Sequence, residues 1–289
     1  MNNDAAQRFL FEQSDVRGEF VSLDESFMGV VLKRQYPVVI RQFLGELLVS
    51  AVLLTSTLKF EGELTIQLEV GGDVSLLVAK CNDQLCIRGL AQWEDGAITQ
   101  QLCDDFDKGK LVITVQPARS TRYYQSIVPV EGRSVAQAIE HYFEQSEQLS
   151  TRLWLTVSGD KAAGMLLQKL PSSISEDEDD DEYWNHVVTL AETLSPQDIV
   201  KLDNVEILHR LYHAEDIRFF DEKGVKFSCT CSVQRMEKAI LTLGSSEASE
   251  MLLNREAIQV VCEFCGHAYE FDHIDIADIF SRHGGDKLH

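Results

Sequence analysis

Four cysteines near the C-terminus constrain this chain more than any other feature. They form two close pairs, Cys229 with Cys231 and Cys262 with Cys265, and thirty residues lie between the C-x-C pair and the C-x-x-C pair. Two thiol pairs joined by a segment long enough to fold are what a tetrahedral four-cysteine zinc site requires, with Zn–S distances of about 2.3 Å. Gly266 follows Cys265, as in the turn of a zinc knuckle. The spacing therefore predicts a small zinc-binding domain.

The C-x-C pair adds a second expectation, because structural zinc sites more often space their cysteines by two to four residues. Oxidation would close this pair into a very small ring, and strained disulfides tend to be labile and regulatory. Zinc holds its cysteines as thiolates, which are the oxidisable form, and each thiolate here has a neighbouring thiol with which to form a disulfide. The motif therefore predicts a zinc centre that responds to redox state.

Composition limits the class of protein and its partners. The chain has 289 residues, of which 44% are hydrophobic and 25% charged, as in ordinary globular proteins, and its net charge is −21. This charge argues against nucleic acid and anionic membranes as partners, since both bind to clusters of Lys and Arg. The longest nearly apolar stretch, residues 47–58, is too short and too rich in Ser and Thr to span a bilayer. Seven cysteines and no secretory signal indicate reduced thiols in the cytoplasm.

Residues 1–175 predict an N-terminal domain of α+β class with a mostly antiparallel sheet. Residues 63–70 alternate strictly, with Leu64, Ile66, Leu68 and Val70 on one face, which indicates a half-buried strand. Gly71-Gly72-Asp73 then predicts a hairpin turn. The other strands that we expect span residues 74–79, 85–91, 111–115, 123–130, 153–157 and 165–170. Because several strands follow one another directly, antiparallel pairing is favoured over a doubly wound sheet.

Two long helices are expected beside these strands. The first spans residues 37–58, begins at Pro37 and is apolar on most of its circumference, which predicts burial between layers. The second begins at Ser134, with Gln137 three residues later in a capping-box pattern, and continues to about residue 149.

Residues 176–226 predict a linker. It opens with seven consecutive acidic residues, 176–182, which should be solvated and flexible. Three short helices should follow, the second capped by Ser195 before Pro196 and the third capped by Asn204. Such helices are too short to be stable alone, so they need a surface to lie on. Their apolar face comprises Val187, Leu190, Leu194, Leu208 and Leu211.

Residues 227–289 predict the zinc domain, with a helix over residues 233–243 that ends at Gly244. About sixty residues bury too little apolar surface to form a stable fold without a disulfide or a structural metal. Structural zinc contributes on the order of 10–16 kcal/mol in small zinc peptides. We therefore expect this part to unfold when the metal leaves.

Over essentially its whole length, the chain resembles the redox-regulated holdase chaperones of the heat shock protein 33 family. The cysteine set at positions 229, 231, 262 and 265 is the most specific element of this resemblance. The supporting stretches are Val16-Arg17-Gly18-Glu19, Gly45-Glu46-Leu47-Leu48, Ser146-Glu147-Gln148-Leu149, Ala162-Ala163-Gly164-Met165-Leu166-Leu167-Gln168 and Leu211-Tyr212-His213.

The resemblance implies a bacterial cytoplasmic protein with a client-binding and dimerisation domain, a metastable linker and a redox-switch domain. In the family, four thiolates hold one Zn²⁺ in the reduced, inactive state. Oxidation, which for this chain implies the disulfides Cys229–Cys231 and Cys262–Cys265, releases zinc and unfolds the switch domain and the linker. The protein, commonly as a homodimer, then binds unfolding clients without ATP, so the resemblance predicts a stress-response chaperone and not an enzyme.

Three other functions compete with this one. A zinc ribbon that binds nucleic acid is disfavoured by the acidic charge. A thiol–disulfide oxidoreductase is the main enzyme alternative, because C-x-x-C is its signature, but here the pair belongs to a four-thiol set. A catalytic metal at His209 and His213 lacks the H-E-x-x-H pattern, so these histidines are expected to pack on a helix or face solvent.

The remaining cysteines and two histidines near the zinc motif carry weaker signals. Cys81, Cys86 and Cys103 match no family motif and are expected to be inert core thiols or to form side disulfides under oxidation. His267 and His273 flank the knuckle. Because four thiolates already complete the tetrahedron, these histidines are expected at most to contact the ligands.

Overall fold

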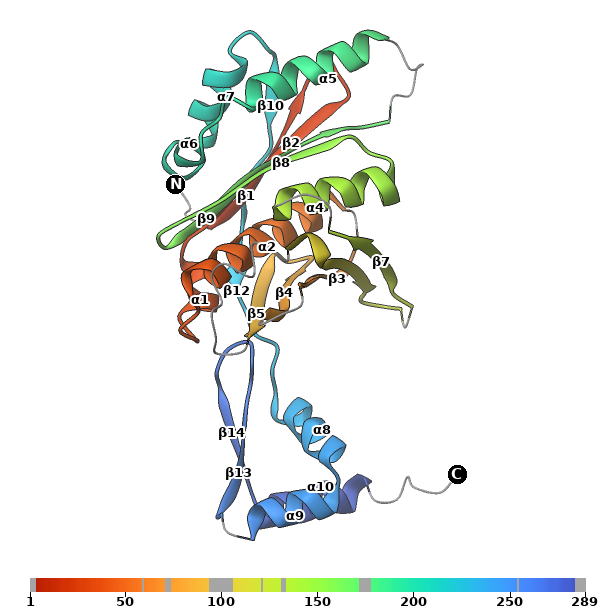
Figure 1. Cartoon of the computed structure of the whole chain (residues 1–289), viewed down its shortest axis with the longest axis vertical. Coiled ribbons are helices and arrows are strands. Elements are labelled where there is room, and N and C mark those ends of the chain that lie inside the picture. Colours follow the sequence, from red (N-terminus) through yellow and green to blue (C-terminus); the bar gives the residue numbers. More distant parts are fainter. Residues whose placement is uncertain are drawn as a thin grey trace. The chain divides into compact units, whose positions relative to one another are not determined.

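In this computed structural model the chain divides into two units, Met1–Ser228 and Cys229–His289, called unit 1 and unit 2 below. The structure describes residues 4–58, 60–70, 74–93, 106–120, 122–130, 134–171, 178–253 and 255–283. Unit 1 has alternating layers of helices and sheets: linker helices, a first sheet, the central helices and a second sheet (Figure 1). The predicted α+β class with antiparallel sheets is confirmed.

The first sheet, sheet A, is antiparallel and runs in the order β10-β1-β2-β9-β8, with β11 also paired to β1. Its strands are β1 (Ala5–Phe11), β2 (Val16–Leu23), β8 (Thr151–Ser158), β9 (Lys161–Lys169), β10 (Ile217–Phe219) and β11 (Lys223–Gly224). The two strands before residue 24 and the short helix α1 (Glu25–Val31) have no counterpart in the sequence prediction. Both faces of this sheet are covered, so its strands lack the alternation that identifies a half-buried strand.

The second sheet, sheet B, runs in the order β12-β5-β4-β3-β6-β7, and β12 pairs parallel to β5. Its strands are β3 (Gly62–Glu69), β4 (Val74–Asn82), β5 (Cys86–Trp93), β6 (Lys110–Pro117), β7 (Tyr124–Pro129) and β12 (Lys226–Phe227). Leu64, Ile66 and Leu68 of β3 are fully buried, and β3 pairs antiparallel with β4, as the alternation predicted. The predicted turn at residues 71–73 lies outside the described residues.

Helix α2 (Val38–Thr57) lies between the two sheets, with α4 (Val135–Tyr142) beside it. Pro37 is the N-cap of α2. By length and composition alone α2 could span a membrane, but 78% of its most apolar window is buried inside the fold, as expected for a core helix. Ser134 caps α4 by accepting a hydrogen bond from the Gln137 N–H, as predicted, and a π-helical turn (Phe143–Glu147) continues that helix.

Glu46 is a buried carboxyl group within α2. Burial raises its pKa to about 7, although a hydrogen bond from Gln42 acts in the opposite direction. A carboxyl group whose pKa is raised in the folded state contributes stability that is full at low pH and is lost as the pH rises through the folded-state pKa. A shift from 4.5 to about 7 corresponds to about 3 kcal/mol.

We therefore expect the free energy of unfolding of unit 1 to fall between about pH 4.5 and pH 7, and Glu46→Gln to make this dependence shallower. Glu19 has a pKa that is also raised to about 7 by burial, so the variant should remove only one part of the slope. Urea unfolding followed by tryptophan fluorescence measures this, because all three tryptophans lie in unit 1. If the free energy of unfolding depends on pH equally in the wild type and in Glu46→Gln, the expectation is contradicted.

Gly18 of β2 is required by a close approach. A Cβ atom built on Gly18 would lie 2.0 Å from Cζ of Phe9, a fully buried ring on the neighbouring strand. We expect Gly18→Ala to destabilise unit 1 by about 1–3 kcal/mol, because the ring must move within a close-packed core. Urea unfolding measures the loss, and the double variant Gly18→Ala/Phe9→Leu should recover part of it. If the losses of unfolding free energy caused by Gly18→Ala and Phe9→Leu simply add in the double variant, the clash with the Phe9 ring is not the cause of the destabilisation.

The linker helices cover the outer face of sheet A. They are α5 (Glu178–Ala191), α6 (Pro196–Lys201) and α7 (Asn204–Tyr212). Val187, Leu208 and Leu211 are buried there, and Leu190 and Leu194 are half-buried. The surface beneath them is one apolar cluster, which we call the linker platform: Phe9, Phe11, Val16, Phe20, Met165 and Leu167.

Two details of the predicted linker are wrong. Helix α5 begins at Glu178, inside the acidic run that was expected to be flexible; residues 176–177 lie outside the described residues. Lys169 of β9 lies 2.6 Å from Asp181, an ion pair that offsets part of the repulsion between neighbouring carboxylates. The cap of α7 is Asp203, which accepts a hydrogen bond from the Glu206 N–H; Asn204 is the first helical residue instead.

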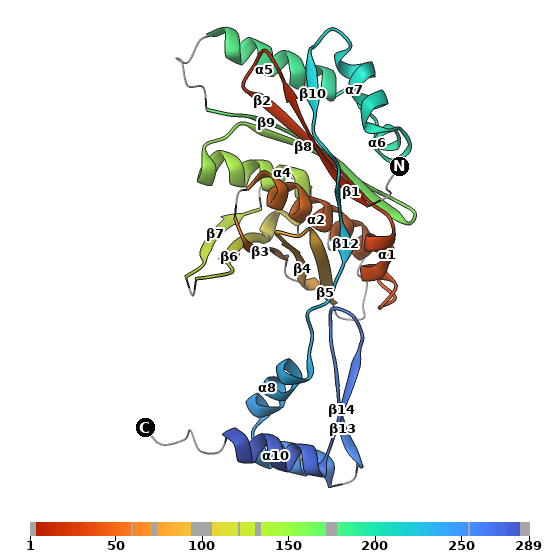
Figure 2. The ribbon, with the colours of Figure 1, turned by 180° about the vertical axis from the view of Figure 1, so that it is seen from behind.

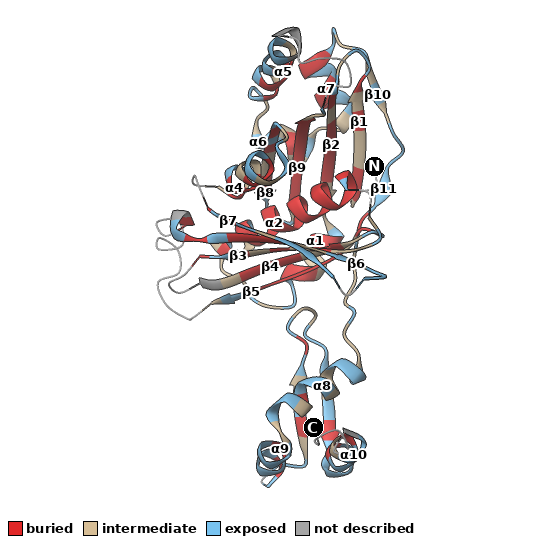
Figure 3. Cartoon of the chain, turned by 90° about the vertical axis from the view of Figure 1, so that its right-hand side faces the viewer, coloured by how far each residue is buried: buried red, intermediate tan, exposed pale blue. Residues whose placement is uncertain are grey.

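Unit 2 is built from α8 (Val233–Leu243), α9 (Ser245–Leu252), the hairpin β13 (Ala257–Val261) and β14 (Ala268–Asp272), and α10 (His273–His283). Helix α8 has the predicted bounds and ends at Gly244, whose φ of 92° suits glycine. Among the described residues of this unit, seven buried hydrophobic residues form the core: Ile240, Ala248, Leu252, Ile258, Phe271, Ile276 and Ile279. Figure 3 shows how little of unit 2 is buried, compared with the sheets and central helices of unit 1.

Candidate metal centre

The four predicted cysteines come from an extended segment and from a turn of unit 2. Cys229 and Cys231 lie in the extended segment before α8, whose N-cap Ser232 accepts a hydrogen bond from the Arg235 N–H. Cys262 and Cys265 lie in the turn between β13 and β14. The cap holds the first pair next to a helix and the hairpin holds the second pair, so both pairs have a local reason for their positions.

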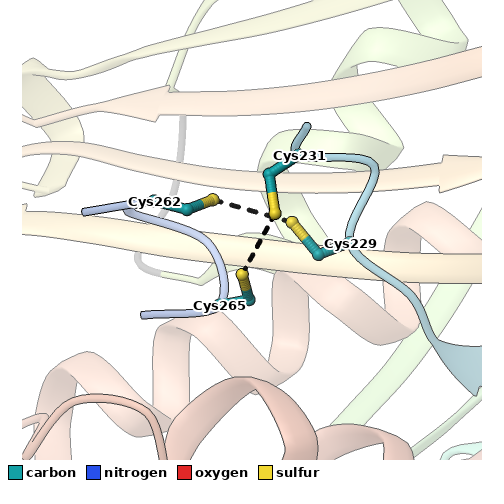
Figure 4. A group of neighbouring side chains, drawn as sticks. All are labelled: Cys229, Cys231, Cys262 and Cys265. Atoms are coloured by element: carbon teal, nitrogen blue, oxygen red, sulfur yellow. Dashed lines mark hydrogen bonds between the residues drawn. The ribbon is translucent and has the colours of Figure 1, made fainter. Parts of the chain in front are cut away.

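The C-x-x-C turn is a tight loop closed by backbone hydrogen bonds. The N–H of Cys262 donates to the carbonyl of His267 (2.9 Å), and the N–H of Gly266 donates to the carbonyl of Cys262 (2.8 Å). Gly266 has a φ of 70°, in the left-handed region that favours glycine. This loop reverses the chain and directs both thiols to the same side of the hairpin (Figure 4).

The four sulfur atoms converge on one point (Figure 4). All lie within 4.8 Å of one another, with Cys229 Sγ 3.7 Å from Cys262 Sγ and Cys231 Sγ 3.5 Å from Cys265 Sγ. A tetrahedral ion with metal–sulfur distances of about 2.3 Å separates its sulfurs by about 3.8 Å. The arrangement fits such an ion, and it is the only group of three or more potential ligands found in the described part of the chain.

The surroundings of the sulfurs act unequally on their protonation. Burial raises the pKa of the Cys229 thiol, and contacts with neighbouring thiols add to this effect. Burial also acts to raise the pKa of Cys231, but hydrogen bonds from Tyr269 and the other thiols outweigh it, so this pKa is lowered. Of these two cysteines, Cys231 is therefore the one whose surroundings favour the thiolate, which is the form that binds metal and reacts with oxidants.

Tyr269 is a residue of this site that the sequence analysis missed. Its hydroxyl donates a hydrogen bond to Cys231 Sγ (3.1 Å), which raises the pKa of Tyr269 to about 12. The Tyr269 ring lies edge-on to His267, with ring centroids 4.5 Å apart. Tyr269 follows Cys265 by four residues, but no metal-site pattern includes a tyrosine there, and the hairpin geometry alone brings it to the other cysteine pair.

The other candidate residues do not join a cluster. Cys81 is buried, and burial raises its pKa to about 12, consistent with an inert thiol; Cys86 is half-buried and free. Cys103 lies outside the described residues. His209, His213, His267 and His273 are all exposed, and the metal-ligand group contains none of them.

Comparisons with known proteins identify relatives along nearly the whole chain. The sequence profile of the family described as Hsp33 protein matches residues 4–272. The 33 kDa chaperonin of Ectopseudomonas mendocina (strain ymp) is 43% identical, across 98% of this chain and 97% of the relative. That of Pseudomonas syringae pv. syringae (strain B728a) is 41% identical, across 99% and 96%. The relatives carry the name of a chaperonin, not of an enzyme.

A solved structure has the same fold. The crystal structure of a 33 kDa chaperonin, a heat shock protein 33 homologue from Thermotoga maritima, superposes with a TM-score of 0.82. It is 18% identical in sequence, and the match covers 98% of this chain and 99% of the other. At this identity the likeness concerns the fold alone.

Proposed function

We propose, because this chain belongs to the Hsp33 protein family, that it is a redox-regulated holdase that is inactive with zinc bound and active once its four thiols are oxidised. Family membership makes it a chaperone-family protein that binds client proteins. The observation that carries the finer proposal is the convergence of four thiols in a unit with a small core.

Zinc is the metal that the donor set favours. Four cysteine sulfurs are soft ligands, which select zinc over the oxygen-binding ions Mg²⁺ and Ca²⁺. Cys229, Cys231, Cys262 and Cys265 would all be ligands, and a four-thiolate site leaves no open position for catalysis. Zinc bound there would contribute folding free energy to unit 2, in which seven residues of the described part form the core. Its role would be structural and regulatory.

Oxidation would remove the ligands. Formation of the disulfides Cys229–Cys231 and Cys262–Cys265 transfers two electrons per disulfide to an oxidant such as hydrogen peroxide, which is reduced to two molecules of water. The shortest sulfur contacts instead join Cys229 to Cys262 and Cys231 to Cys265. We propose the sequence-adjacent pairing because the resemblance to the family implies it, and the folded-state contacts between the two pairs would then have to separate before the disulfides form.

Unfolding of unit 2 would then release the linker and expose the linker platform. Each of the three parts of the chain would have one role in this process. Residues 1–175 would bind clients and dimerise, residues 176–226 would form the releasable linker, and residues 227–289 would form the redox switch. Clients would be unfolding proteins, held without ATP by a homodimer in the bacterial cytoplasm. Nucleic acid and membranes remain excluded as proposed partners, on the net charge of −21.

A paired measurement on one sample tests the proposal. The reduced, zinc-loaded protein is treated with peroxide at elevated temperature, and zinc release and suppression of aggregation of a denatured client are followed together. We expect zinc to be released at one equivalent per chain, in step with the gain of activity. Activity at full zinc content, or loss of zinc without activity, would contradict the proposed switch.

Peptide mapping of the same sample tests the disulfide pairing. We expect the tryptic peptide that contains Cys229 and Cys231 to carry one internal disulfide, and likewise the peptide that contains Cys262 and Cys265. Peptides cross-linked between the two pairs would show that the sulfur contacts of the folded state decide the pairing.

A further inference from the structure

One short segment covers an edge of both sheets in unit 1. This segment, residues 216–228, is called the strap below; it leads from the linker helices to Ser228, directly before Cys229. Its strands β10 and β11 pair with β1 at the edge of sheet A, and β12 pairs with β5 at the edge of sheet B. Figure 2 shows the strap passing from one sheet to the other.

We infer that the edge of β1, once the strap leaves it, is a binding site for extended segments of unfolding clients, which add as a strand to sheet A. This inference rests on the proposed function, in which the linker and the chain before Cys229 are released. It specifies the class of client segment and the backbone atoms that hold it.

The strap itself shows what fits this edge. It pairs antiparallel with β1, with Phe9 opposite Phe219, Leu10 opposite Arg218 and Phe11 opposite Ile217. The N–H of Phe220 donates to the carbonyl of Arg8 (3.0 Å), and the N–H of Glu12 donates to the carbonyl of Asp216 (2.9 Å). Antiparallel pairs alternate, so Arg8, Leu10 and Glu12 present their backbone groups to the strap.

The side chains of the strap define the preferred client segment. Ile217 and Phe219 point to the linker platform, and they are separated by the exposed Arg218, which forms an ion pair with Glu12 (3.1 Å). A client segment that replaces the strap should therefore alternate apolar and polar residues, with a basic residue opposite Leu10, where it can pair with the Glu12 carboxylate as Arg218 does. Such a strand forms main-chain hydrogen bonds with the edge of β1, and every second side chain packs against the linker platform.

The strap is held weakly enough to be replaced. It forms only three pairs through β10, two through β11 and two through β12, and most of its side chains are exposed. Beneath it lies a cavity of about 270 Å³, lined by Phe220, Asp221 and Lys223 of the strap and by Ala6, Arg8 and Glu19 of the sheet. Within the described part of the chain, Arg8 Nε and Glu19 Oε2 have no hydrogen-bond partner. Few contacts and incomplete packing are features of segments that open locally.

Release of the strap would leave β1 as an open edge. Unpaired N–H and C=O groups at a sheet edge are a template for any extended chain, and native proteins cover such edges. In the resting protein the strap provides this cover. The edge is therefore available only when the segment next to Cys229 detaches, which in the wild-type protein would confine strand addition at β1 to the oxidised state.

Backbone-blocked peptides test this inference in the full-length protein. The probe is a fluorescent peptide with the sequence of residues 214–222, titrated into the peroxide-oxidised protein and followed by anisotropy. One version is N-methylated at the residues equivalent to Arg218 and Phe220, whose N–H groups face β1. The control version is N-methylated at Phe219, whose N–H faces away. We expect the parent and the control to bind and the first version to bind about tenfold more weakly or not at all.

A second arm does not depend on oxidation. The variant Ile217→Asp/Phe219→Asp should release the strap while the protein stays reduced and zinc-loaded, and it should bind the parent peptide at least about tenfold more tightly than the reduced wild type. Circular dichroism and zinc content confirm that both units remain folded.

Equal binding of the two N-methylated peptides would overturn the inference, as would failure of the parent peptide to bind a sample that has lost zinc and suppresses aggregation. In either case the holdase proposal survives. An oxidised sample that keeps its zinc and does not suppress aggregation would instead refute the proposed function. If the strap variant Ile217→Asp/Phe219→Asp stays folded and reduced but does not bind the parent peptide, the proposed site at the edge of β1 is also refuted.

Discussion

Removal of the metal from the reduced protein with a strong chelator should unfold unit 2 and leave unit 1 folded. Structural zinc contributes on the order of 10–16 kcal/mol in small zinc peptides. The core of the described part of unit 2 contains only seven buried residues with which to offset that loss. Unit 1, in contrast, has an extensive apolar core around α2 and no part in binding the metal.

Hydrogen–deuterium exchange with mass spectrometry measures this effect. Amides of β13 and β14 should lose their protection after chelation, whereas those of α2 and β3 should keep it. Addition of zinc should restore protection, and Cys265→Ser should reproduce the chelated state under reducing conditions. Unchanged protection in β13 after complete metal removal would show that the core of unit 2 is sufficient by itself.

Val187→Asp should activate the protein while it is reduced and loaded with zinc. Val187 is fully buried in α5, against the linker platform, and Tyr212 donates a hydrogen bond to its carbonyl (2.8 Å). An unpaired carboxylate at this position would cost on the order of 3–5 kcal/mol, more than the docked linker helices can offset. We expect the linker to detach and the platform to become accessible to clients. The same change at the half-buried Leu190 or Leu194 should have a smaller effect.

Limited proteolysis of α5–α7 and suppression of client aggregation, both at full zinc content, measure this activation. Val205→Asp is the matched control, because Val205 lies on α7 but is 59% exposed. This control should remain protease-resistant and inactive. If Val187→Asp detaches the linker and the protein stays inactive, then exposure of the platform is not what activates it.

Residues with a short repeating pattern were predictable because their environment is simple. In β3, one face is buried and the other is partly open, so Leu64, Ile66 and Leu68 alternate with polar residues. In α8, the end at Gly244 is a local signal that needs no tertiary contact. The cysteine spacing is of the same kind, since the members of each pair are only two or three positions apart in the chain.

Strands β1 and β2, whose two faces are both covered, were not predicted from the sequence. Strand β2 carries the buried Glu19 toward the cavity under the strap and Phe20 toward the linker platform, so apolar and polar residues do not alternate. Strands β10 and β11 are too short to show any period. The acidic start of α5 looked like a flexible run because its charge pattern does not reveal Lys169, which comes from a distant strand.

The sequence by itself determined the chemical groups of this protein: two cysteine pairs that could hold a metal ion, an acidic chain and a linker with one apolar face. Only the tertiary structure decided that the sulfurs converge within 4.8 Å, that Tyr269 donates to Cys231, and that the strap covers the edges of both sheets. The physical reason is the distance along the sequence between the residues that interact. Ligand type and helix caps depend on residues a few positions apart, whereas sheet edges and hydrogen bonds between turns depend on segments that folding alone brings together.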